Sequence, residues 1–417
     1  MNYSEPTFLK IWDEHNVHSI FFVIFASQTS TPCMHILELP SFFTPYGGEF
    51  CLEQAKALRS LGHEVRILSN VQLGLSISKL RYFTYPYGRS WHEADGVPVY
   101  QTLMRGYPKQ VRRNMERWVA VVRSMFADYV RQYGKPDVVH AHCAKWAGYA
   151  AMLIADDYGV PYVITEHMSL HTFQSEFGTA PSSSWQIPLL RKAYERAKMV
   201  IPVAEELVDD ISCYFGKNYR WQAISNMIDV VFFAFRSRSP LSGRPFRFVC
   251  SAINEWRKGY DVLLAAFDQM EEKNAELHIC GRGTDLPAFG RCVNGLASAS
   301  RIFVHGDLNK QQVRDLLWQC DALALATRGE VQPLVLLEAM STGIPYVSTE
   351  KVPRCERLEG AAHIVSVDDV AAFAKAMDAL VRKGFAGGER VSEQVRQMAS
   401  PAVVARQIEE VLKSAVG

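Results

Sequence analysis

The chain has 417 residues, of which 48% are hydrophobic and 21% are charged, a length suited to two domains rather than one core. Lysine and arginine number 45 against 44 acidic residues, so a formal net charge of +1 supplies no global field for a nucleic-acid partner. Nine scattered cysteines form no Cys-x-x-Cys pair, which argues against a disulfide framework or a zinc site and fits reduced thiols in the cytosol.

The first strand of the fold is expected after an N-terminal extension. Met34 begins the run Met-His-Ile-Leu-Glu-Leu-Pro, which predicts a strand leading into a loop with Gly47 and Gly48. Residues 1–33 are therefore interpreted as an extension outside the fold. The apolar run at 20–26 is too short to cross a membrane and lacks the basic flank of a signal peptide. The alternative for this run is an additional edge strand.

From Met34 onward, short apolar runs alternate with helical patterns, as is typical of mostly parallel sheets with helices on both faces. The first series predicts strands at 35–40, 65–69, 98–103, 137–141, 161–165 and 199–203, and helices at 48–61, 110–132, 144–158 and 186–197. The second series predicts strands at 246–251, 275–280, 301–305, 321–326 and 345–348, and helices at 259–272, 285–297, 309–319, 333–342 and 368–382. A stretch rich in Arg, Ser, Pro and Gly at 232–245 is interpreted as a linker. The sequence therefore predicts an α/β protein with two Rossmann-like domains, and a last helix from Pro401.

Two acidic residues, Glu330 and Glu338, lie eight positions apart in the second series. Glu330 falls in a polar loop, and Glu338 lies in a helix expected to begin near Pro333 and to end at Gly343. A helix N-terminus offers unpaired N–H groups and a positive dipole end, which favour phosphate. The two carboxylates beside it could hold two hydroxyl-bearing parts of one ligand. The alternative is a helix with a solvated acidic residue.

With Leu-Val-Leu-Leu-Glu-Ala-Met and Gly-Ile-Pro, this segment closely resembles the donor-site signature of retaining glycosyltransferases of family 4, which have the GT-B fold. The resemblance implies that Glu330 faces the donor sugar in catalysis and that Glu338 holds the ribose hydroxyls. It also places Leu334 and Val335 in the donor site. The sequence Val-Gln-Pro at 331–333 stands where the family has Gly-Phe-Gly, so the identity of the donor stays open.

A basic pair, Arg257 and Lys258, precedes Gly259 in the loop after the strand at 246–251. A basic pair before a helix N-terminus is well placed to bind a diphosphate. The alternative is an exposed pair on a surface turn. The resemblance assigns Lys258 to the donor phosphates and to catalysis, because the family has Lys-Gly here. Arg257 is interpreted as the replacement for an arginine that the family carries a few residues earlier.

Two pairs of glycines follow predicted strands. Gly281 and Gly283 could let the backbone pass close to a nucleotide, and both are assigned to the donor site, with a plain turn as the alternative. Leu286 stands where a dinucleotide fingerprint needs its third glycine, which counts against an NAD enzyme. Gly47 and Gly48 resemble the glycine-rich loop of the family, and we assign Gly47 to the acceptor and Gly48 to the donor.

Histidines and an acid close two predicted strands at 137–141 and 161–165. His140 and His142 could ligate a metal from one strand face, but no third ligand is evident from the sequence. The resemblance implies that His142 contacts the transferred sugar and is catalytic. Glu166 and His167 would face the acceptor.

A basic and aromatic stretch at 79–91 precedes a helix that carries Arg112 and Arg113. The basic and aromatic residues of the stretch include Arg81, Tyr82, Tyr85, Arg89 and Trp91. Such a surface could rest on anionic lipid headgroups, and the alternative is an ordinary solvated face. Peripheral contact with the inner face of the membrane is therefore kept as an option.

The resemblance covers nearly everything after Met34 and implies an acceptor-binding domain at 34–232, facing a nucleotide-sugar domain at 233–400 across a cleft. The helix at 401–417 would cross back to the first domain. The expected activity is that of a cytoplasmic hexosyltransferase-type enzyme. It would move a sugar, with retention, from a nucleoside-diphosphate sugar to a saccharide or lipid-linked acceptor in exopolysaccharide or lipopolysaccharide biosynthesis.

No cofactor and no metal are expected, because no Asp-x-Asp motif occurs and basic residues would take the place of the metal. The sequence leaves open whether the nucleotide is uridine or guanosine diphosphate. Two other functions are compatible with it. One is a GT-B-fold sugar-nucleotide epimerase, and the other is a non-catalytic nucleotide-sugar binder.

Overall fold

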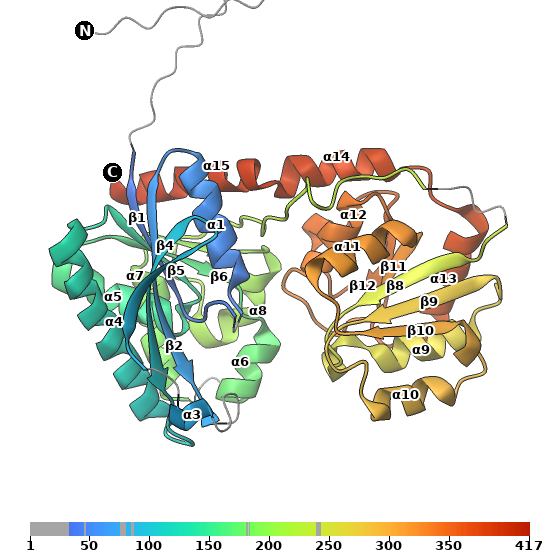
Figure 1. Ribbon diagram of the computed structural model, residues 1–417, viewed down its shortest axis with the longest axis horizontal. Helices are drawn as coiled ribbons and strands as arrows, with labels where there is room; N and C mark the ends of the chain where they lie inside the picture. The colour runs from blue at the N-terminus through green and yellow to red at the C-terminus, as the bar shows by residue number, and fades with distance from the viewer. Residues whose placement is uncertain are drawn as a thin grey trace, which may run out of the picture. The chain divides into compact units, whose positions relative to one another are not determined.

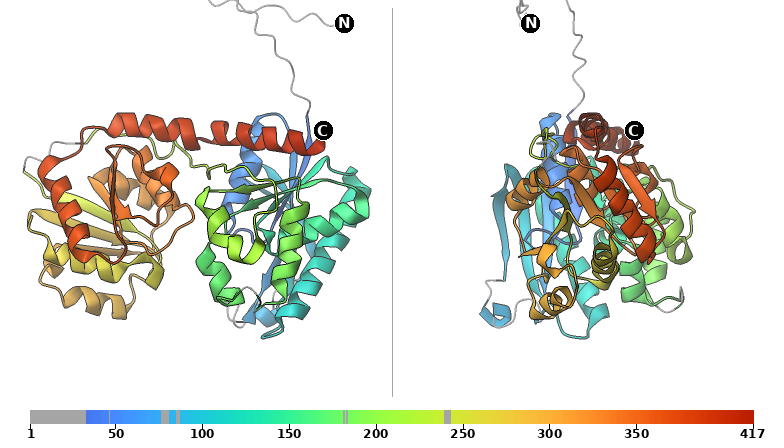
Figure 2. Two further views of the ribbon diagram at one scale, coloured as in Figure 1. Left: turned by 180° about the vertical axis from the view of Figure 1, so that it is seen from behind. Right: turned by 90° about the vertical axis from the view of Figure 1, so that its right-hand side faces the viewer.

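The structure is a computed structural model whose described part begins at Cys33 and contains two sheets with helices on both faces of each (Figures 1 and 2). The described residues are 33–45, 47–75, 81–84, 87–180, 182, 184–238 and 243–417. The extension predicted at 1–33 and the alternative strand at 20–26 therefore lie outside the described residues, apart from Cys33 itself.

The first sheet has seven strands in the order β3-β4-β2-β1-β5-β6-β7. Its strands are β1 His35–Pro40, β2 Glu64–Leu73, β3 Arg89–Ala94, β4 Val97–Arg105, β5 Val138–His142, β6 Tyr162–Glu166 and β7 Met199–Pro202. Among them β3 alone is antiparallel, and it pairs with β4 at the edge. The helices of this half are α1 Glu49–Ser60, α3 Arg81–Thr84, α4 Val111–Tyr133, α5 Tyr149–Tyr158, α6 Leu170–Phe177, α7 Gln186–Arg196 and α8 Glu206–Phe215.

The second sheet has six parallel strands in the order β10-β9-β8-β11-β12-β13. They are β8 Phe246–Ser251, β9 Ala275–Cys280, β10 Ile302–Gly306, β11 Ala322–Leu325, β12 Tyr346–Thr349 and β13 Ala362–Val365. The helices are α9 Tyr260–Gln269, α10 Pro287–Asn294, α11 Lys310–Gln319, α12 Leu334–Ser341, α13 Val370–Lys383, α14 Gly388–Ala399 and α15 Pro401–Val416. A short 3₁₀ turn, η2 Trp256–Lys258, separates β8 from α9.

Both sheets share one strand order if the edge strand β3 is set aside. Counted along the chain, the parallel strands of each run 3-2-1-4-5-6, the doubly wound order in which ligands bind at the carboxyl ends beside the first and fourth strands. These strands are β1 and β5 in the first sheet, and β8 and β11 in the second. The topology alone therefore marks two places where polar side chains can meet a ligand.

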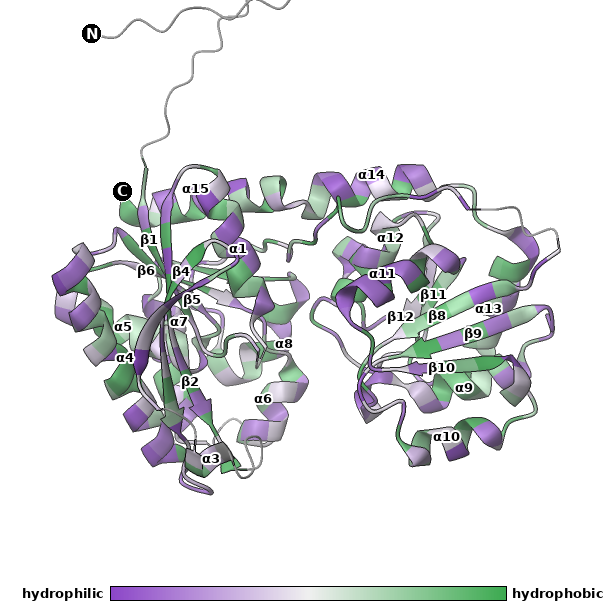
Figure 3. Ribbon diagram, viewed as in Figure 1, coloured by the Kyte–Doolittle hydropathy of each residue, from purple (hydrophilic) through white to green (hydrophobic). Residues whose placement is uncertain are grey.

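Most strands are buried on both faces, whereas β3 and β10 carry exposed side chains, and the helices bury one apolar stripe each. Figure 3 shows the hydropathy of the residues along these elements. In α4 the stripe includes Met115, Trp118 and Phe126, all of them buried. The last helix, α15, packs Val404 and Ile408 into the core of the first sheet. An ion pair between His63 and Glu409 at 2.9 Å accompanies that packing. The domain boundaries at 232 and 400 stay predictions.

The two predicted α/β series are present, and every predicted strand and helix has a counterpart. The sequence analysis missed several short elements: β3, β13, α3, α6, α8 and α14. The stretch at 79–91 was not predicted to contain a strand, but its last residues begin the edge strand β3, Arg89–Ala94. The helix predicted at 144–158 is also interrupted, since a π turn at Ala144–Gly148 precedes α5.

Candidate functional site

Three predicted site residues meet at the switch point of the second sheet. Lys258 Nζ lies 2.6 Å from Glu330 Oε1, and Arg257 Nη1 lies 3.0 Å from Glu330 Oε2. The hydroxyl of Thr327 also donates to Glu330 Oε1, at 3.0 Å. The side chain of Glu330 is only 6% exposed. The carboxylate therefore holds both cations, and the group as a whole keeps one net positive charge.

The backbone locks the two loops of this group together. Gly259 has a φ of +68°, and a Cβ added to it would lie 1.8 Å from the carbonyl oxygen of Ala326. The amide of Arg328 donates to the carbonyl of Arg257 at 2.7 Å. The loop after β8 and the loop after β11 are thus in direct contact, because glycine is the residue that fits there. The charged side chains are held by two strand ends of one rigid sheet.

The helix α12 follows Glu330 directly and has no side-chain cap at its N-terminus. Its first N–H groups are therefore available to an anion. Leu334 is 38% exposed on this first turn, with Val335 beside it half-buried. The sequence suggested that Pro333 belongs to the first turn of this helix. In the structure Pro333 is the residue before the helix.

Glu338 lies inside α12, one turn from the exposed end. Burial raises its pKa to about 7, and Lys310 counteracts this only in part. A carboxyl group in this range can ionise when a ligand donates hydrogen bonds to it. This property suits a side chain that binds two neighbouring hydroxyl groups.

A cavity of about 320 Å³ opens at the carboxyl ends of β8, β9 and β10. It is lined by Ser251, Ala252, Ile253, Gly281, Arg282, Asp307, Leu308 and Val313. A Cβ on Gly281 would lie 1.9 Å from the carbonyl oxygen of Ala252, so this glycine permits close packing of two strand ends. Gly283 is fixed by a hydrogen bond from Asn254 to its carbonyl at 3.1 Å. Of the predicted glycine pair, Gly281 therefore lines a cavity of the second sheet, as a residue of a nucleotide-binding loop would.

Glu356 is an acidic residue that the sequence analysis missed. It is fully buried in the loop after β12, and neither carboxyl oxygen has a hydrogen-bond partner. Burial, followed by the charges of Glu330 and Glu206, raises its pKa well above the usual value. A buried acid whose pKa is raised in part by Glu330 is a candidate for a functional role. Its position after the predicted strand at 345–348 was the signal available in the sequence.

Gln332 occupies part of the segment where the family has Gly-Phe-Gly. Its Oε1 accepts the amide of Asn226 at 2.6 Å, and its Nε2 donates to the hydroxyl of Ser225 at 2.6 Å. The side chain thereby attaches the loop of Glu330 to the segment that follows β7. No feature of the sequence indicated these two bonds.

The switch point of the first sheet brings together His140, His142 and a residue that the sequence analysis missed, Glu38. Glu38 Oε2 lies 3.0 Å from His140 Nδ1 and 2.7 Å from His142 Nε2. All three side chains are fully buried. Burial alone would raise the pKa of Glu38, but the two histidines outweigh it and lower the value to about 2. Glu38 was overlooked because it stands in an apolar strand run.

This trio is the one set of described residues whose His, Cys or carboxylate groups converge as metal ligands would, within 4.8 Å of one another. It supplies the third group that the sequence did not reveal. However, the two distances to Glu38 are hydrogen-bond lengths, and each ring nitrogen that faces it already has that partner. The three side chains therefore form a hydrogen-bonded trio.

The remaining predicted acceptor residues have different surroundings. Glu166 is fully buried and accepts the backbone amides of Ala144, His167 and Met168 at 2.8–3.0 Å. Burial raises the pKa of Glu166 in spite of these bonds. Glu166 thus braces the loops after β5 and β6, which is a structural task and leaves little capacity for an acceptor. The His167 ring stacks on Phe50 with centroids 3.6 Å apart.

The glycine loop after β1 lies beside the same switch point. Gly47 and Gly48 have φ values of +96° and +83°, and a Cβ on Gly48 would lie 2.1 Å from the carbonyl oxygen of Phe42. Gly48 is also the residue before α1, with an uncapped N-terminus. The pair is placed where a ligand could approach the backbone, near His142.

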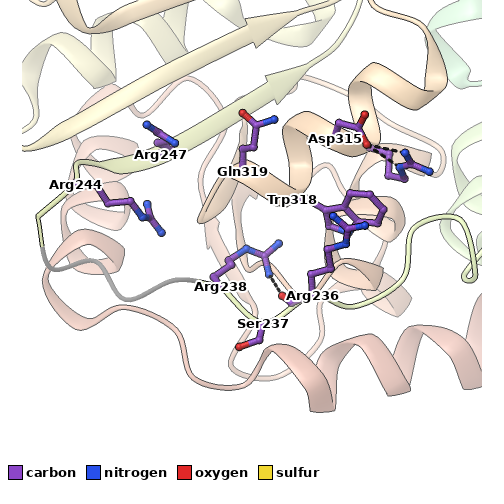
Figure 4. A pocket seen from close by; sticks show the side chains of 9 residues that line it. Arg236, Ser237, Arg238, Arg244, Arg247, Asp315, Trp318 and Gln319 are labelled. Atoms are coloured by element: carbon purple, nitrogen blue, oxygen red, sulfur yellow. Dashed lines mark hydrogen bonds and ion pairs between the residues drawn. The ribbon is translucent and has the colours of Figure 1, made fainter.

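A second cavity, of about 670 Å³, lies away from the β8 and β11 carboxyl ends and is rich in arginine (Figure 4). Its lining residues are Arg236, Ser237, Arg238, Arg244, Arg247, Arg314, Asp315, Trp318 and Gln319. Arg244 pairs with Asp321, Arg247 with Glu276 and Arg314 with Asp315. Arg238 donates to the carbonyls of Cys320 and Thr342 at the ends of two helices. These bonds give most of its arginines a structural role.

The predicted membrane-facing surface is only partly formed. Tyr82 is buried and donates to the carbonyl of Gly106, so it does not belong to an exposed patch. Trp91 stacks on Tyr100 with centroids 4.9 Å apart. Arg112 is 72% exposed beside the exposed Arg113. Tyr85 and the side chain of Arg81 lie outside the described residues. Within the described part of the chain, no helix is both long and apolar enough to span a bilayer.

Family comparisons match both halves of the chain. Residues 47–227 match the family described as glycosyl transferase 4-like domain, and residues 245–383 match the glycosyl transferases of group 1. A Bacillus subtilis protein named as a teichuronic acid biosynthesis glycosyltransferase, TuaC, is 23% identical over 334 residues, 75% of this chain and 78% of that protein. A glycogen synthase of Mycobacterium tuberculosis is 26% identical over 307 residues, 70% of this chain and 71% of the relative.

Solved structures with low sequence identity share the fold. The sucrose-phosphate synthase of Thermosynechococcus elongatus has a TM-score of 0.71 at 16% identity, over 91% of this chain and 98% of that one. Anabaena HepE in complex with UDP and glucose has a TM-score of 0.68 at 19% identity, over 91% of this chain and all of the other. The predicted fold class, with two Rossmann-like units, is confirmed by these likenesses.

Proposed function

The chain belongs to the group 1 glycosyltransferases and has the GT-B fold, and we propose that it transfers a sugar, with retention, from a nucleoside diphosphate to a saccharide or lipid-linked acceptor. The observation that carries this proposal is the contact of Arg257 and Lys258 with Glu330 at the switch point of the second sheet. Two cations, one acid and an uncapped helix end meet there, which is the chemistry that a sugar diphosphate requires.

The diphosphate would bind to Lys258, Arg257 and the first N–H groups of α12. Charge-assisted bonds to these groups stabilise the negative charge that develops as the nucleoside diphosphate departs. Glu330 would then be released towards the hydroxyl groups of the donor sugar. The ribose would bind Glu338, one turn further along α12.

The nucleobase would occupy the cavity of about 320 Å³ at the ends of β8, β9 and β10. Arg282 and Asp307 supply polar groups to its lining, and Leu308 and Val313 supply apolar area. Such a mixture suits a flat heterocycle with donors and acceptors at its edge. HepE, which shares the fold, was crystallised with UDP and glucose. A uridine or guanosine nucleotide remains open for this chain.

Retention would follow if the acceptor hydroxyl attacks from the face of the sugar that the diphosphate leaves. A departing phosphate oxygen then takes the proton of that hydroxyl, and the new glycosidic bond forms as the old one breaks. His142, at the switch point of the first sheet, would bind the transferred sugar. No cofactor or metal is needed for this scheme, and activity is expected to survive excess EDTA.

The acceptor is proposed to be a saccharide or a lipid-linked saccharide in the biosynthesis of a cell-surface polysaccharide, at the cytoplasmic face of the membrane. The name of the B. subtilis relative, which refers to teichuronic acid biosynthesis, supports this class. The exposed Arg112 and Arg113 are available to an anionic surface.

A panel of UDP- and GDP-sugars, followed by release of nucleoside diphosphate with and without saccharide acceptors, tests the proposal. Acceptor-dependent release with an α-linked product from an α-linked donor is the expected result. Interconversion of sugar nucleotides without an acceptor would instead indicate an epimerase. Donor binding without any turnover across the panel would indicate a non-catalytic binder.

A further inference from the structure

The hydrogen-bond pattern around Glu38 determines where the protons of the neighbouring histidines lie. An ionised carboxylate can only accept hydrogen bonds. Because Glu38 Oε2 faces His140 Nδ1 at 3.0 Å and His142 Nε2 at 2.7 Å, both of these nitrogens must carry protons. Glu38 is therefore an acceptor shared by two imidazole rings.

The other nitrogen of each ring has a contrasting environment. His140 Nε2 lies 2.7 Å from the hydroxyl of Thr165, which can donate to it. His142 Nδ1 is buried and has no hydrogen-bond partner. Burial lowers the pKa of His142, and His140 adds to this, which favours the neutral ring with a lone pair on Nδ1. A buried acceptor without a donor costs about 1–3 kcal/mol.

The ring of Phe50 lies beside the ring of His142. The Phe50 ring centroid lies 5.7 Å from that of His142, and Phe50 itself is only half-buried. Phe50 follows the glycine loop at Gly47 and Gly48 and lies on the first turn of α1. The side chain of Phe50 therefore brings the first turn of α1, and the glycine loop before it, next to the ring of His142.

We propose that Glu38 is a positioning residue that fixes the Nε2–H tautomer of His142, and thereby presents Nδ1 as an acceptor for a sugar hydroxyl. The identity of the ligand as a sugar rests on the proposed function, whereas the tautomer of His142 does not. The same logic operates wherever a carboxylate selects the tautomer of a functional histidine. A fixed acceptor would hold one hydroxyl of the transferred sugar while the diphosphate departs.

The tautomer can be measured directly in the full-length, ¹⁵N-labelled protein by long-range ¹H–¹⁵N correlation of the imidazole rings. His142→Gln identifies the signals of His142. We expect a protonated Nε2 and an unprotonated Nδ1 for this ring near neutral pH. A protonated Nδ1, a doubly protonated ring, or one equivalent of tightly bound transition metal in the purified protein would overturn the inference.

Removal of the shared acceptor tests the part that Glu38 plays. In Glu38→Leu no acceptor faces the two rings, so nothing holds the protons on His140 Nδ1 and His142 Nε2. We expect a change of tautomer in His140 or His142, and a fall of roughly tenfold or more in kcat with unchanged affinity for nucleoside diphosphate. The control Thr165→Val removes the donor to His140 Nε2 and should leave the His142 tautomer intact. Unchanged tautomers in a folded Glu38→Leu protein would contradict the proposal.

The failures of the two proposals can be told apart. A chain that shows the Nε2–H tautomer but transfers no sugar would overturn the proposed function and support the assignment of Glu38. A chain that transfers sugar with His142 protonated at Nδ1 would overturn this inference alone.

Discussion

Lys258 and Glu330 are bound to each other, with Nζ and Oε1 only 2.6 Å apart, although one is proposed for the phosphates and the other for the sugar. Arg257 binds the second oxygen of the same carboxylate. If these roles hold, a donor exchanges partners with this ion pair when it binds. A negative phosphate competes with Glu330 for Lys258 and Arg257. When the phosphate displaces the Glu330 carboxylate, hydroxyl groups of the sugar can donate hydrogen bonds to that carboxylate in place of the cations.

The first prediction concerns the charge of Glu330. Glu330→Gln should lower kcat by one to several orders of magnitude, because the sugar contact is made in the transition state. Affinity for free nucleoside diphosphate should stay equal or increase, since Lys258 and Arg257 lose their competing anion. Steady-state kinetics and isothermal titration calorimetry measure the two effects. Near-normal kcat, or weaker diphosphate binding, would contradict the assignment.

The second prediction concerns Lys258. Lys258→Ala should raise the dissociation constant of the nucleoside diphosphate by roughly tenfold or more, and that of the nucleoside much less, because the lost contact is to phosphate. Lys375→Ala, at an exposed position of α13, is the matched control and should change neither constant. Calorimetric titrations with both ligands decide the matter. Equal losses for nucleoside and diphosphate would place Lys258 away from the phosphates.

The third prediction concerns the pH dependence of nucleoside binding. The pKa of Glu338 is raised to about 7, so much of this side chain is protonated below neutrality. The ionised carboxylate accepts two ribose hydroxyls, and binding must then release a proton at low pH. Affinity for the nucleoside should increase as pH rises from about 6 to about 8. Glu338→Gln should bind more weakly with a flat profile, and a wild-type profile that is flat or inverted would argue against the ribose contact.

The fourth prediction concerns stability. The raised pKa of Glu356 means that the folded chain keeps a proton that the unfolded chain loses as pH rises through its ordinary pKa. The contribution of protonated Glu356 to the free energy of unfolding is therefore greatest in acid. It is lost as the pH rises towards the folded-state pKa of Glu356. Relative to Glu356→Gln, the wild-type free energy of unfolding should fall by up to about 1.4 kcal/mol per pH unit above about pH 4.5. Urea denaturation of both proteins across this range tests it, and parallel profiles would show an ionised Glu356.

The fifth prediction concerns the membrane. Binding to liposomes should rise with anionic lipid and fall with salt, because Coulombic attraction is screened over about 10 Å at 0.1 M. Replacing Arg112 and Arg113 by Glu should reduce this binding and leave nucleotide affinity intact. Cosedimentation with vesicles of increasing phosphatidylglycerol content is the measurement. Binding that ignores both salt and the double substitution would assign these arginines to an ordinary solvated face, and would favour a soluble acceptor.

Periodicity was sufficient for most of the fold because strands buried on both faces produce continuous apolar runs. It failed where burial is one-sided or short, as in the edge strand β3, whose side chains are mostly exposed or half-buried. The resemblance indicated Glu330, Lys258 and Glu338 because they stand in local motifs. Glu38 could not be found in this way, since its partners His140 and His142 lie about a hundred residues away in the sequence.

The bonds from Gln332 to Ser225 and Asn226 have a consequence for exchanging halves between related enzymes. Recombining the second half of this chain with the first half of a relative would separate Gln332 from its two hydrogen-bond partners. A chimera of that kind would leave the buried side-chain amide of Gln332 without its hydrogen-bond donor and acceptor. A chimera that takes Ser225, Asn226 and Gln332 from the same parent would keep both hydrogen bonds. The crossover point for such hybrids should therefore fall before Ser225 rather than in the stretch at 232–245.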